Sequence, residues 1–254
     1  MLLVLAGCSS GDGDVASTTT APATATTTTP PTGGCAPPVG TEPAPTTPST
    51  TTSTAPPATT TTSTVPPVPL GPGDAGPAVS VLQERLSELG YWVGAADGEY
   101  GSATTHAVTA FQKAEGLDRD GIASSAVQNR LADASRPVAR STEGRVIEID
   151  LARQVLLVVT DGRVEVVLDT ATGAVATPTP PGQYSIYREI DGYRHAPLGT
   201  LYRPKYFNGG IAIHGSTSVP AQPASHGCVR LTYPAMDHIW TAGLAPLGTA
   251  VWVY

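Results

Sequence analysis

Residues 9–70 consist almost entirely of threonine, proline, alanine and serine, and this segment limits what the chain can fold into. It contains no lysine or arginine, and its charged side chains are Asp12, Asp14 and Glu42. Such a composition offers too little apolar surface to offset the entropy lost on ordering, so we predict a disordered linker. Folded structure is therefore expected in residues 71–254, which are enough for one small and one medium core.

The net charge of −7 is spread along the chain without creating a strongly basic domain. The linker carries −3, residues 71–135 carry nine acidic against four basic side chains, and residues 136–254 carry nine against ten. Nucleic-acid-binding domains usually present a basic face, so nucleic acid is not an expected partner.

The three cysteines lie in three different settings. Cys8 closes the sequence Leu-Ala-Gly-Cys, the pattern of a bacterial lipoprotein signal in which this cysteine receives lipid. The apolar stretch before it is shorter than the usual run of about 7–15 residues, so residues 1–8 are interpreted as a signal remnant. Cys35 lies in the linker and Cys228 near the end of the chain. An odd thiol in a secreted protein suggests reactivity rather than a disulfide framework.

Residues 71–135 show the periodicity of helices. In the first helix apolar residues recur at steps of three and four, and Gly90 is expected to end it. Ser102 is the expected N-cap of a second helix, which Gly116 ends, and a third short helix follows. The predicted core positions are Val79, Leu82, Leu86, Leu89, Ala107, Val108, Phe111, Ala114, Val127 and Leu131. The pattern predicts a small all-α domain of three helices.

This helical segment resembles the peptidoglycan-binding domain that is appended to bacterial wall enzymes. The matching positions are Val81-Leu82-Gln83, Leu86, Leu89-Gly90-Tyr91, Asp97-Gly98, Tyr100-Gly101, Ala107-Val108, Phe111-Gln112, Gly116-Leu117 and Asp120-Gly121-Ile122. The resemblance implies binding to the cell wall. Tyr91, Trp92 and Tyr100 are candidate contacts for sugar rings, and a place in the hydrophobic core is the alternative for these aromatic side chains.

From Arg145 onward the hydrophobic period changes to two, which predicts strands. Asp161-Gly162 is a strong hairpin signal, and Thr232 can cap a single helix over residues 234–242. The expected strands are residues 145–151, 154–160, 163–170, 183–188, 211–214 and 250–254. Residues 144–254 are therefore expected to form a mainly β domain with one packed helix.

One thiol and two imidazoles come close together in the sequence of this β domain. His226 is two residues before Cys228, so the two would share a face if both lay on an extended strand. His214 ends a separate predicted strand that could pair beside Cys228. A histidine can take the proton of a thiol and return it to a leaving amine, so either histidine is a candidate base. The N–H groups around Gly227 and Cys228 could form an oxyanion hole.

Two other interpretations of these residues stay open at this point. Cys228 could be a small buried hydrophobe, as most lone cysteines on strands are. It could also bind zinc together with His226 and His214, because three protein ligands are enough for a catalytic zinc site. Arg230 could bind a carboxylate of a substrate or form a structural ion pair.

The motif Ile213-His214-Gly215 with Ser225-His226-Gly227-Cys228-Val229-Arg230-Leu231 resembles the active-site signature of the bacterial L,D-transpeptidases. Further matching positions are Ile149-Asp150-Leu151, Gln154, Thr179-Pro180, Pro181-Gly182, Pro204-Lys205-Tyr206-Phe207 and Gly248-Thr249-Ala250-Val251. The resemblance implies a β-sandwich-like catalytic domain. It makes Cys228 the nucleophile and His214 the general base, oriented by the Gly215 carbonyl. Ser225, His226, Gly227 and Arg230 would form the oxyanion and substrate side.

The resemblance further implies a reaction that needs no cofactor and no metal. Cys228 would attack a tetrapeptide stem of peptidoglycan, release D-alanine and form a thioester, which an amine of a neighbouring stem resolves into a 3→3 cross-link. Water or a protein amine as acceptor, giving a carboxypeptidase or an attachment enzyme, and a non-catalytic wall anchor are the alternatives. We expect a monomer in the cell envelope, held to the membrane only through lipid at Cys8.

Overall fold

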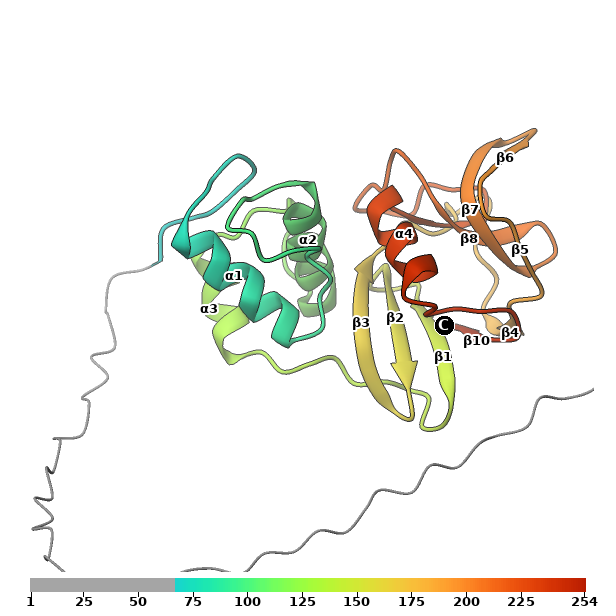
Figure 1. Ribbon diagram of the computed structural model, residues 1–254, viewed down its shortest axis with the longest axis horizontal. Helices are drawn as coiled ribbons and strands as arrows, with labels where there is room; N and C mark the ends of the chain where they lie inside the picture. Colours follow the sequence, from blue (N-terminus) through green and yellow to red (C-terminus); the bar gives the residue numbers. More distant parts are fainter. Residues whose placement is uncertain (1–66) are drawn as a thin grey trace, which may run out of the picture. The chain divides into compact units, whose positions relative to one another are not determined.

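The structure is a computed structural model and describes residues 67–254 (Figure 1). Cys8, Cys35 and residues 1–66, with most of the predicted linker, lie outside the described residues. Residues 67–70, which we had assigned to the linker, contact the helical domain. The Leu70 N–H donates to the Ala123 carbonyl at 3.0 Å, and the Ser125 hydroxyl donates to the Pro67 carbonyl at 2.6 Å.

Three helices form the domain that follows, as predicted. They are α1 (Pro77–Glu88), α2 (Ser102–Glu115) and α3 (Ser125–Asp133). Gly116 ends α2 in the left-handed region with φ 69°, a conformation that favours glycine. The prediction for Ser102 was wrong: Gly101 is the N-cap and Ser102 is the first helical residue, without a side-chain cap. Its hydroxyl lies one position too late to serve the first turn.

The aromatic side chains proposed as sugar contacts belong to the core of the molecule. Tyr91 and Tyr100 are buried, with exposed fractions of 1% and 2%, and the Tyr100 hydroxyl donates to the Gly121 carbonyl at 2.7 Å. Trp92 stacks on His238 of the β domain, with ring centroids 5.6 Å apart. The sugar-contact prediction is therefore wrong for Tyr91 and Tyr100, because neither ring is accessible.

The β domain contains two sheets and one helix. The first sheet has the order β3-β2-β1-β10-β4, in which β1 and β10 are parallel. Its strands are β1 (Arg145–Asp150), β2 (Val155–Thr160), β3 (Arg163–Asp169), β4 (Gly182–Ser185) and β10 (Ala250–Val253). The predicted hairpin turn at Asp161-Gly162 is confirmed, since Thr160 pairs with Arg163 across it.

The second sheet carries the residues of the sequence motif. Its order is β5-β7-β8-β9, and β6 pairs with β7. The strands are β5 (Arg188–Glu189), β6 (Tyr193–Ala196), β7 (Gly199–Asn208), β8 (Ile211–Gly215) and β9 (Val229–Leu231). The β6–β7 hairpin was not predicted, because its sequence lacks a clean alternation. The helix α4 (Tyr233–Thr241) begins at the predicted cap, where the Thr232 hydroxyl accepts from the Ala235 N–H.

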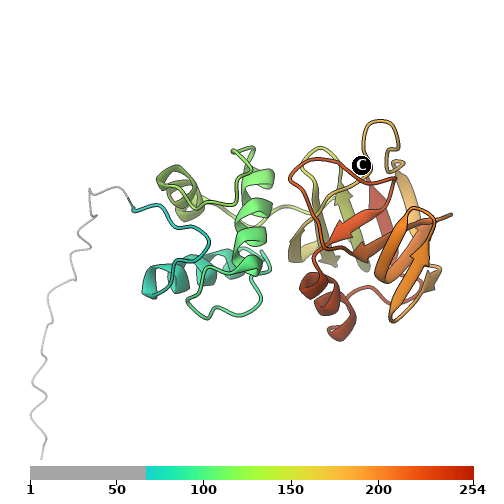
Figure 2. The same cartoon turned by 90° about the horizontal axis from the view of Figure 1, so that it is seen from above.

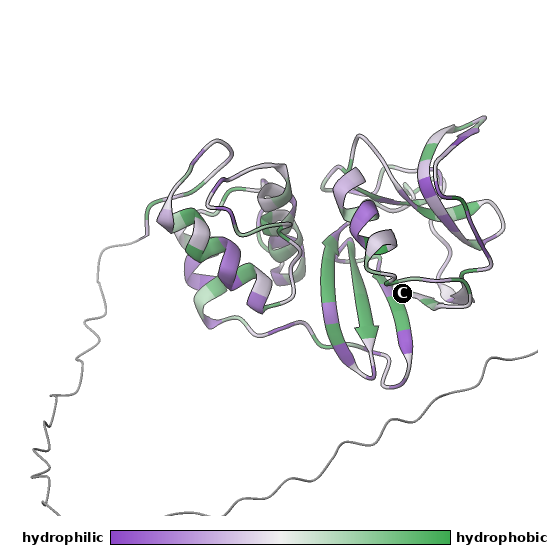
Figure 3. Ribbon diagram, viewed as in Figure 1, coloured by the Kyte–Doolittle hydropathy of each residue, from purple (hydrophilic) through white to green (hydrophobic). Residues whose placement is uncertain are grey.

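The first sheet is buried on both faces, which the alternating pattern of its sequence did not predict. On one face Val155, Leu157 and Val159 of β2 join the hydrophobic core of the helical domain. On the other face Leu156 and Val158 join the core that α4 and the second sheet share. Figures 1 and 2 show α2 beside β3, and Figure 3 shows that β2 is hydrophobic along most of its length. The two domains therefore share one apolar core at their boundary.

Strand β1 contains a buried acid. Glu148 is fully buried and accepts from the Ser141 N–H at 2.7 Å and the Ser141 hydroxyl at 2.7 Å. The segment that joins the two domains supplies these donors.

Within residues 67–254, no helix has the length and apolar character needed to cross a membrane.

Candidate active site

The motif residues gather where β8 and β9 run parallel to each other. Ile213 pairs with Val229 and His214 with Arg230, so Cys228, directly before β9, lies on the same face as His214 and Arg230. All three side chains line one cavity of about 520 Å³. This volume falls within the range of small-molecule sites.

The His214 imidazole is held by its neighbour in the chain. Its Nδ1 lies 2.8 Å from the Gly215 carbonyl oxygen, which is the contact that the resemblance implied. A carbonyl can only accept, so Nδ1 carries the proton and Nε2 is the basic nitrogen. Burial lowers the pKa of His214, the Gly215 carbonyl opposes that shift, and Arg230 adds to it. The side chain is therefore a neutral base at neutral pH.

The Cys228 thiol is half-buried and protonated at rest. Burial raises the pKa of the thiol, while the Ala212 backbone and the Arg230 guanidinium oppose the shift. Its sulfur lies 3.9 Å from the Gly210 carbonyl oxygen, a weak contact. A neutral thiol next to a neutral imidazole favours proton transfer during attack over a preformed ion pair.

The loop before Cys228 is fixed by Ser225. The Ser225 hydroxyl donates to the Cys228 carbonyl at 2.5 Å and accepts from the Gly227 N–H at 3.1 Å. The Gly227 N–H is thus already engaged, so the oxyanion hole that we expected from both N–H groups is reduced to that of Cys228. Gly227 has φ 105°, which side chains rarely adopt, and its conformation explains the glycine better than close approach of a substrate.

Two threonines support this loop, and sequence reasoning did not assign them a role. The Thr179 hydroxyl donates to the Gly227 carbonyl at 2.8 Å, and the Thr172 carbonyl accepts from the Ser225 N–H at 3.0 Å. Thr179 belongs to the matching Thr-Pro sequence, which was the available signal. Thr172 carries no such signal, because its contact depends on the folding of distant segments.

His226 does not lie as the strand argument required. Strand β9 begins at Val229, so His226 is in the preceding turn and its side chain is exposed. It nevertheless lines the same cavity as Cys228 and Arg230. The argument that His226 and Cys228 share a strand face is therefore wrong, and a place on the rim of the cavity replaces it.

Arg230 faces the cavity without an ion-pair partner in the described part of the chain. The ion pairs among residues 67–254 do not include it. The expectation of a structural ion pair is thus wrong, and the guanidinium is free to meet a carboxylate that enters the cavity.

Residues 196–201, around the β6–β7 turn, also line the cavity. The tyrosines near this turn do not line it. Tyr202 and Tyr193 pack together with Tyr233 of α4, and Tyr206 is buried in the second sheet.

The alternative of a zinc site is not supported by the arrangement of the side chains. Among residues 67–254, no three His, Cys, Asp or Glu side chains lie close enough together to hold a metal ion. The proposed ligands Cys228, His226 and His214 line one cavity but do not converge on a point.

Comparison with known proteins agrees with this geometry. Residues 144–253 match the L,D-transpeptidase catalytic domain family YkuD, and residues 75–131 match a family of peptidoglycan-binding domains. No curated protein matches the chain.

One solved structure extends the similarity over both domains. The crystal structure of an L,D-transpeptidase from Xylanimonas cellulosilytica is 44% identical, with a TM-score of 0.71 over 74% of this chain and 98% of that one. An L,D-transpeptidase from Stackebrandtia nassauensis is 25% identical, with a TM-score of 0.46 over 75% of this chain and 97% of that one. The chain therefore belongs to the L,D-transpeptidase family and carries a peptidoglycan-binding domain before its catalytic domain.

Proposed function

We propose that the chain forms 3→3 cross-links in peptidoglycan through a thioester on Cys228. The observation that carries the proposal is the His214 imidazole, whose Nδ1 is bonded to the Gly215 carbonyl at 2.8 Å. That bond leaves Nε2 as a base on the face and in the cavity that Cys228 shares.

In the first half-reaction the Cys228 thiol gives its proton to His214 Nε2, and its sulfur attacks the carbonyl of the third residue of a tetrapeptide stem. The oxyanion that forms accepts a hydrogen bond from the Cys228 N–H. Collapse of the tetrahedral intermediate breaks the C–N bond to D-alanine, and His214 returns the proton to the leaving amine. Arg230 and His226 bind the polar groups of the stem at the edge of the cavity.

In the second half-reaction the side-chain amine of diaminopimelate on a neighbouring stem attacks the thioester. His214 takes a proton from this amine and gives it to the departing sulfur, so the thiol is restored and an amide is formed. No cofactor or metal takes part in this scheme. Water or a protein amine at the same position would give a trimmed stem or an attached protein instead.

The remaining parts of the chain fit a monomer that works in the cell wall. Residues 71–135 would bind the wall, residues 9–66 would act as a tether, and Cys8 would carry the lipid that anchors the chain to the membrane. The catalytic domain, residues 144–254, would then reach stems that lie away from the membrane surface.

Intact-mass analysis after incubation with a defined tetrapeptide stem tests the proposal. We expect a mass increase equal to the acylating stem minus D-alanine on the wild-type chain and none on Cys228→Ala. Addition of an acceptor stem should then produce a cross-linked dimer. Equal labelling of Cys228→Ala would exclude the thioester, a tripeptide without dimer would identify a carboxypeptidase, and an unlabelled wild-type chain would leave a passive anchor.

A further inference from the structure

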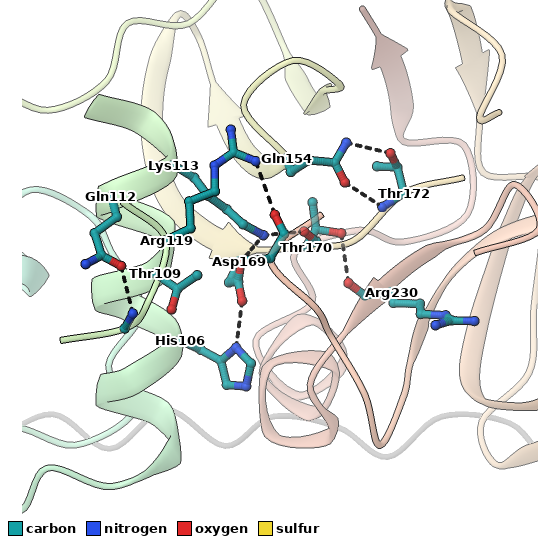
Figure 4. A network of polar contacts seen from close by, with 12 residues as sticks. His106, Thr109, Gln112, Lys113, Arg119, Gln154, Asp169, Thr170, Thr172 and Arg230 are labelled. Atoms are coloured by element: carbon teal, nitrogen blue, oxygen red, sulfur yellow. Dashed lines mark hydrogen bonds and ion pairs between the residues drawn. The ribbon is translucent and has the colours of Figure 1, made fainter. Parts of the chain in front are cut away.

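The helical domain (residues 71–135), called the wall-binding domain from here on, and the catalytic domain (residues 144–254) contact each other through a buried ion pair. Lys113 of α2 places its Nζ 2.6 Å from Asp169 Oδ1 at the end of β3 (Figure 4). His106, about two turns earlier on the same face of α2, places Nδ1 2.6 Å from the second carboxylate oxygen. Lys113 is 1% exposed and Asp169 5%. A charge this deeply buried is tolerated only with a close partner, so the pair fixes how α2 lies on β3.

The same ammonium group reaches the residue that follows Asp169. Lys113 Nζ donates to the Thr170 carbonyl at 2.8 Å. Thr170 is fully buried, so its carbonyl needs a donor from within the protein, and the wall-binding domain supplies it. Burial lowers the pKa of Lys113, and Asp169 opposes the shift.

Thr170 connects directly to the strand that follows the nucleophile. Its hydroxyl donates to the Arg230 carbonyl at 2.8 Å (Figure 4). Ala171 exchanges backbone hydrogen bonds with Arg230, at 3.2 Å in one direction and 2.9 Å in the other. Arg230 pairs with His214 across the β8–β9 ladder. Thr170 is therefore connected through Arg230 to Cys228, two residues earlier in the chain, and to His214 on the neighbouring strand.

The contacts of Thr172, two residues after Thr170, come from the catalytic domain alone. The Gln154 amide accepts from the Thr172 N–H at 2.8 Å and donates to the Thr172 hydroxyl at 2.6 Å. Thr172 in turn holds the Ser225 N–H at 3.0 Å. Thr172 is thus held by the catalytic domain alone, whereas Thr170 is held by the catalytic domain and also by Lys113 of the wall-binding domain.

We propose that Lys113 is a positioning residue for acylation, which links docking of the wall-binding domain to the alignment of Cys228 and His214 through Thr170 and Arg230. The wall-binding domain then contributes to the chemical step in addition to wall attachment. This inference rests on the proposed role of Cys228 as the nucleophile.

The test measures the acylation rate of the full chain by a carbapenem, followed by intact mass. Lys113→Met removes the ammonium and keeps the length of the side chain. Thr170→Val removes the hydroxyl bond to Arg230 without touching the ion pair, and Thr170→Ser retains the hydroxyl. Because small misplacements of reacting groups cost large factors in rate, we expect Lys113→Met and Thr170→Val to be roughly tenfold to a hundredfold slower.

Two comparisons separate positioning from a general loss of structure. Thr170→Ser should acylate close to the wild-type rate, and Lys113→Met combined with Thr170→Val should be no slower than the slower single variant, because both interrupt one connection. Arg130→Gln, at the exposed pair with Glu115, is the matched control in the same domain and should leave the rate unchanged.

The outcomes can be told apart. Wild-type rates in folded Lys113→Met, or in Thr170→Val if Lys113→Met does not fold, would overturn the inference, as would rate losses that simply multiply in the double variant. An absence of acylation in the wild-type chain would instead overturn the proposed function. Cys228→Ala defines the background of the assay.

Discussion

The domain boundary and the catalytic cavity both hold polar groups away from bulk water, but the two regions satisfy them differently. At the boundary the Lys113 ammonium, the Asp169 carboxylate and the Thr170 carbonyl are each paired within 2.8 Å. In the cavity the Arg230 guanidinium meets no carboxylate of residues 67–254. Groups that the fold pairs internally maintain structure, whereas groups left without a partner in a cavity are available to a substrate.

Removing the proposed base, His214, is expected to have the largest effect among these variants. His214→Ala should slow acylation by about 10²–10⁴-fold, because proton transfer from the thiol loses its acceptor. The matched control is His226→Ala at the exposed rim, which should weaken stem binding far more than it slows the chemical step. Single-turnover acylation measured as a function of stem concentration gives both stem binding and the rate of the chemical step. A greater loss in His226→Ala than in His214→Ala would exchange their roles.

Besides its expected effect on acylation, breaking the buried pair should lower stability. Lys113→Met leaves the Asp169 carboxylate buried without its ammonium partner, so the free energy of unfolding should fall by about 3–5 kcal/mol. Lys113→Met combined with Asp169→Leu should recover part of this loss, since no unpaired charge remains. Urea denaturation followed by circular dichroism measures the change. A loss below about 1 kcal/mol in the single variant would show that the pair is not closed to water.

The pH dependence of acylation should reflect the burial of both reacting groups. The pKa of His214 is lowered, so the base stays neutral as the pH falls and the acid limb should have its midpoint below about pH 6.5. The pKa of the Cys228 thiol is raised, so thiolate accumulates only above about pH 8.5 and the rate should still rise there. A stopped-flow profile with a carbapenem measures both limbs. An acid midpoint above the ordinary histidine value would contradict the burial of His214.

The exposed ion pair on the same helical domain should show the smallest effect. Arg130 and Glu115 approach to 2.5 Å, but the Arg130 side chain is 53% exposed. Arg130→Gln should therefore change the free energy of unfolding by only about 0–1 kcal/mol. Urea denaturation under the conditions used for Lys113→Met checks this expectation. An equal loss in both variants would remove the distinction between buried and exposed pairs.

Local features of the fold could be predicted with good accuracy. Gly116 ends its helix, Thr232 caps α4 and Asp161-Gly162 turns a hairpin, because each depends on the conformation of a few consecutive residues. The expectation for Ser102 failed at the level of one residue, since two neighbouring positions could begin the helix. The β6–β7 hairpin was missed because its pairing compensates for a weak local pattern.

The candidate site was predictable in composition but not in detail. The sequence motif named Cys228, His214 and the Gly215 carbonyl, and the structure brings the three together. The motif did not indicate that the Gly227 N–H would donate to the Ser225 hydroxyl, or that His226 would lie in a turn. Those details depend on the exact path of the loop, which Thr172 and Thr179 hold from distant segments.

The sequence by itself determined the helices and several of the strands, the two kinds of domain and the Cys-His motif, because turn residues, periodicity and short motifs act over a few neighbours. Only the tertiary structure decided that the first sheet is covered on both faces, that Tyr91 and Tyr100 are core residues and that Lys113 is buried against Asp169. The physical reason is that burial depends on which surfaces meet, and residues far apart in the chain determine that together.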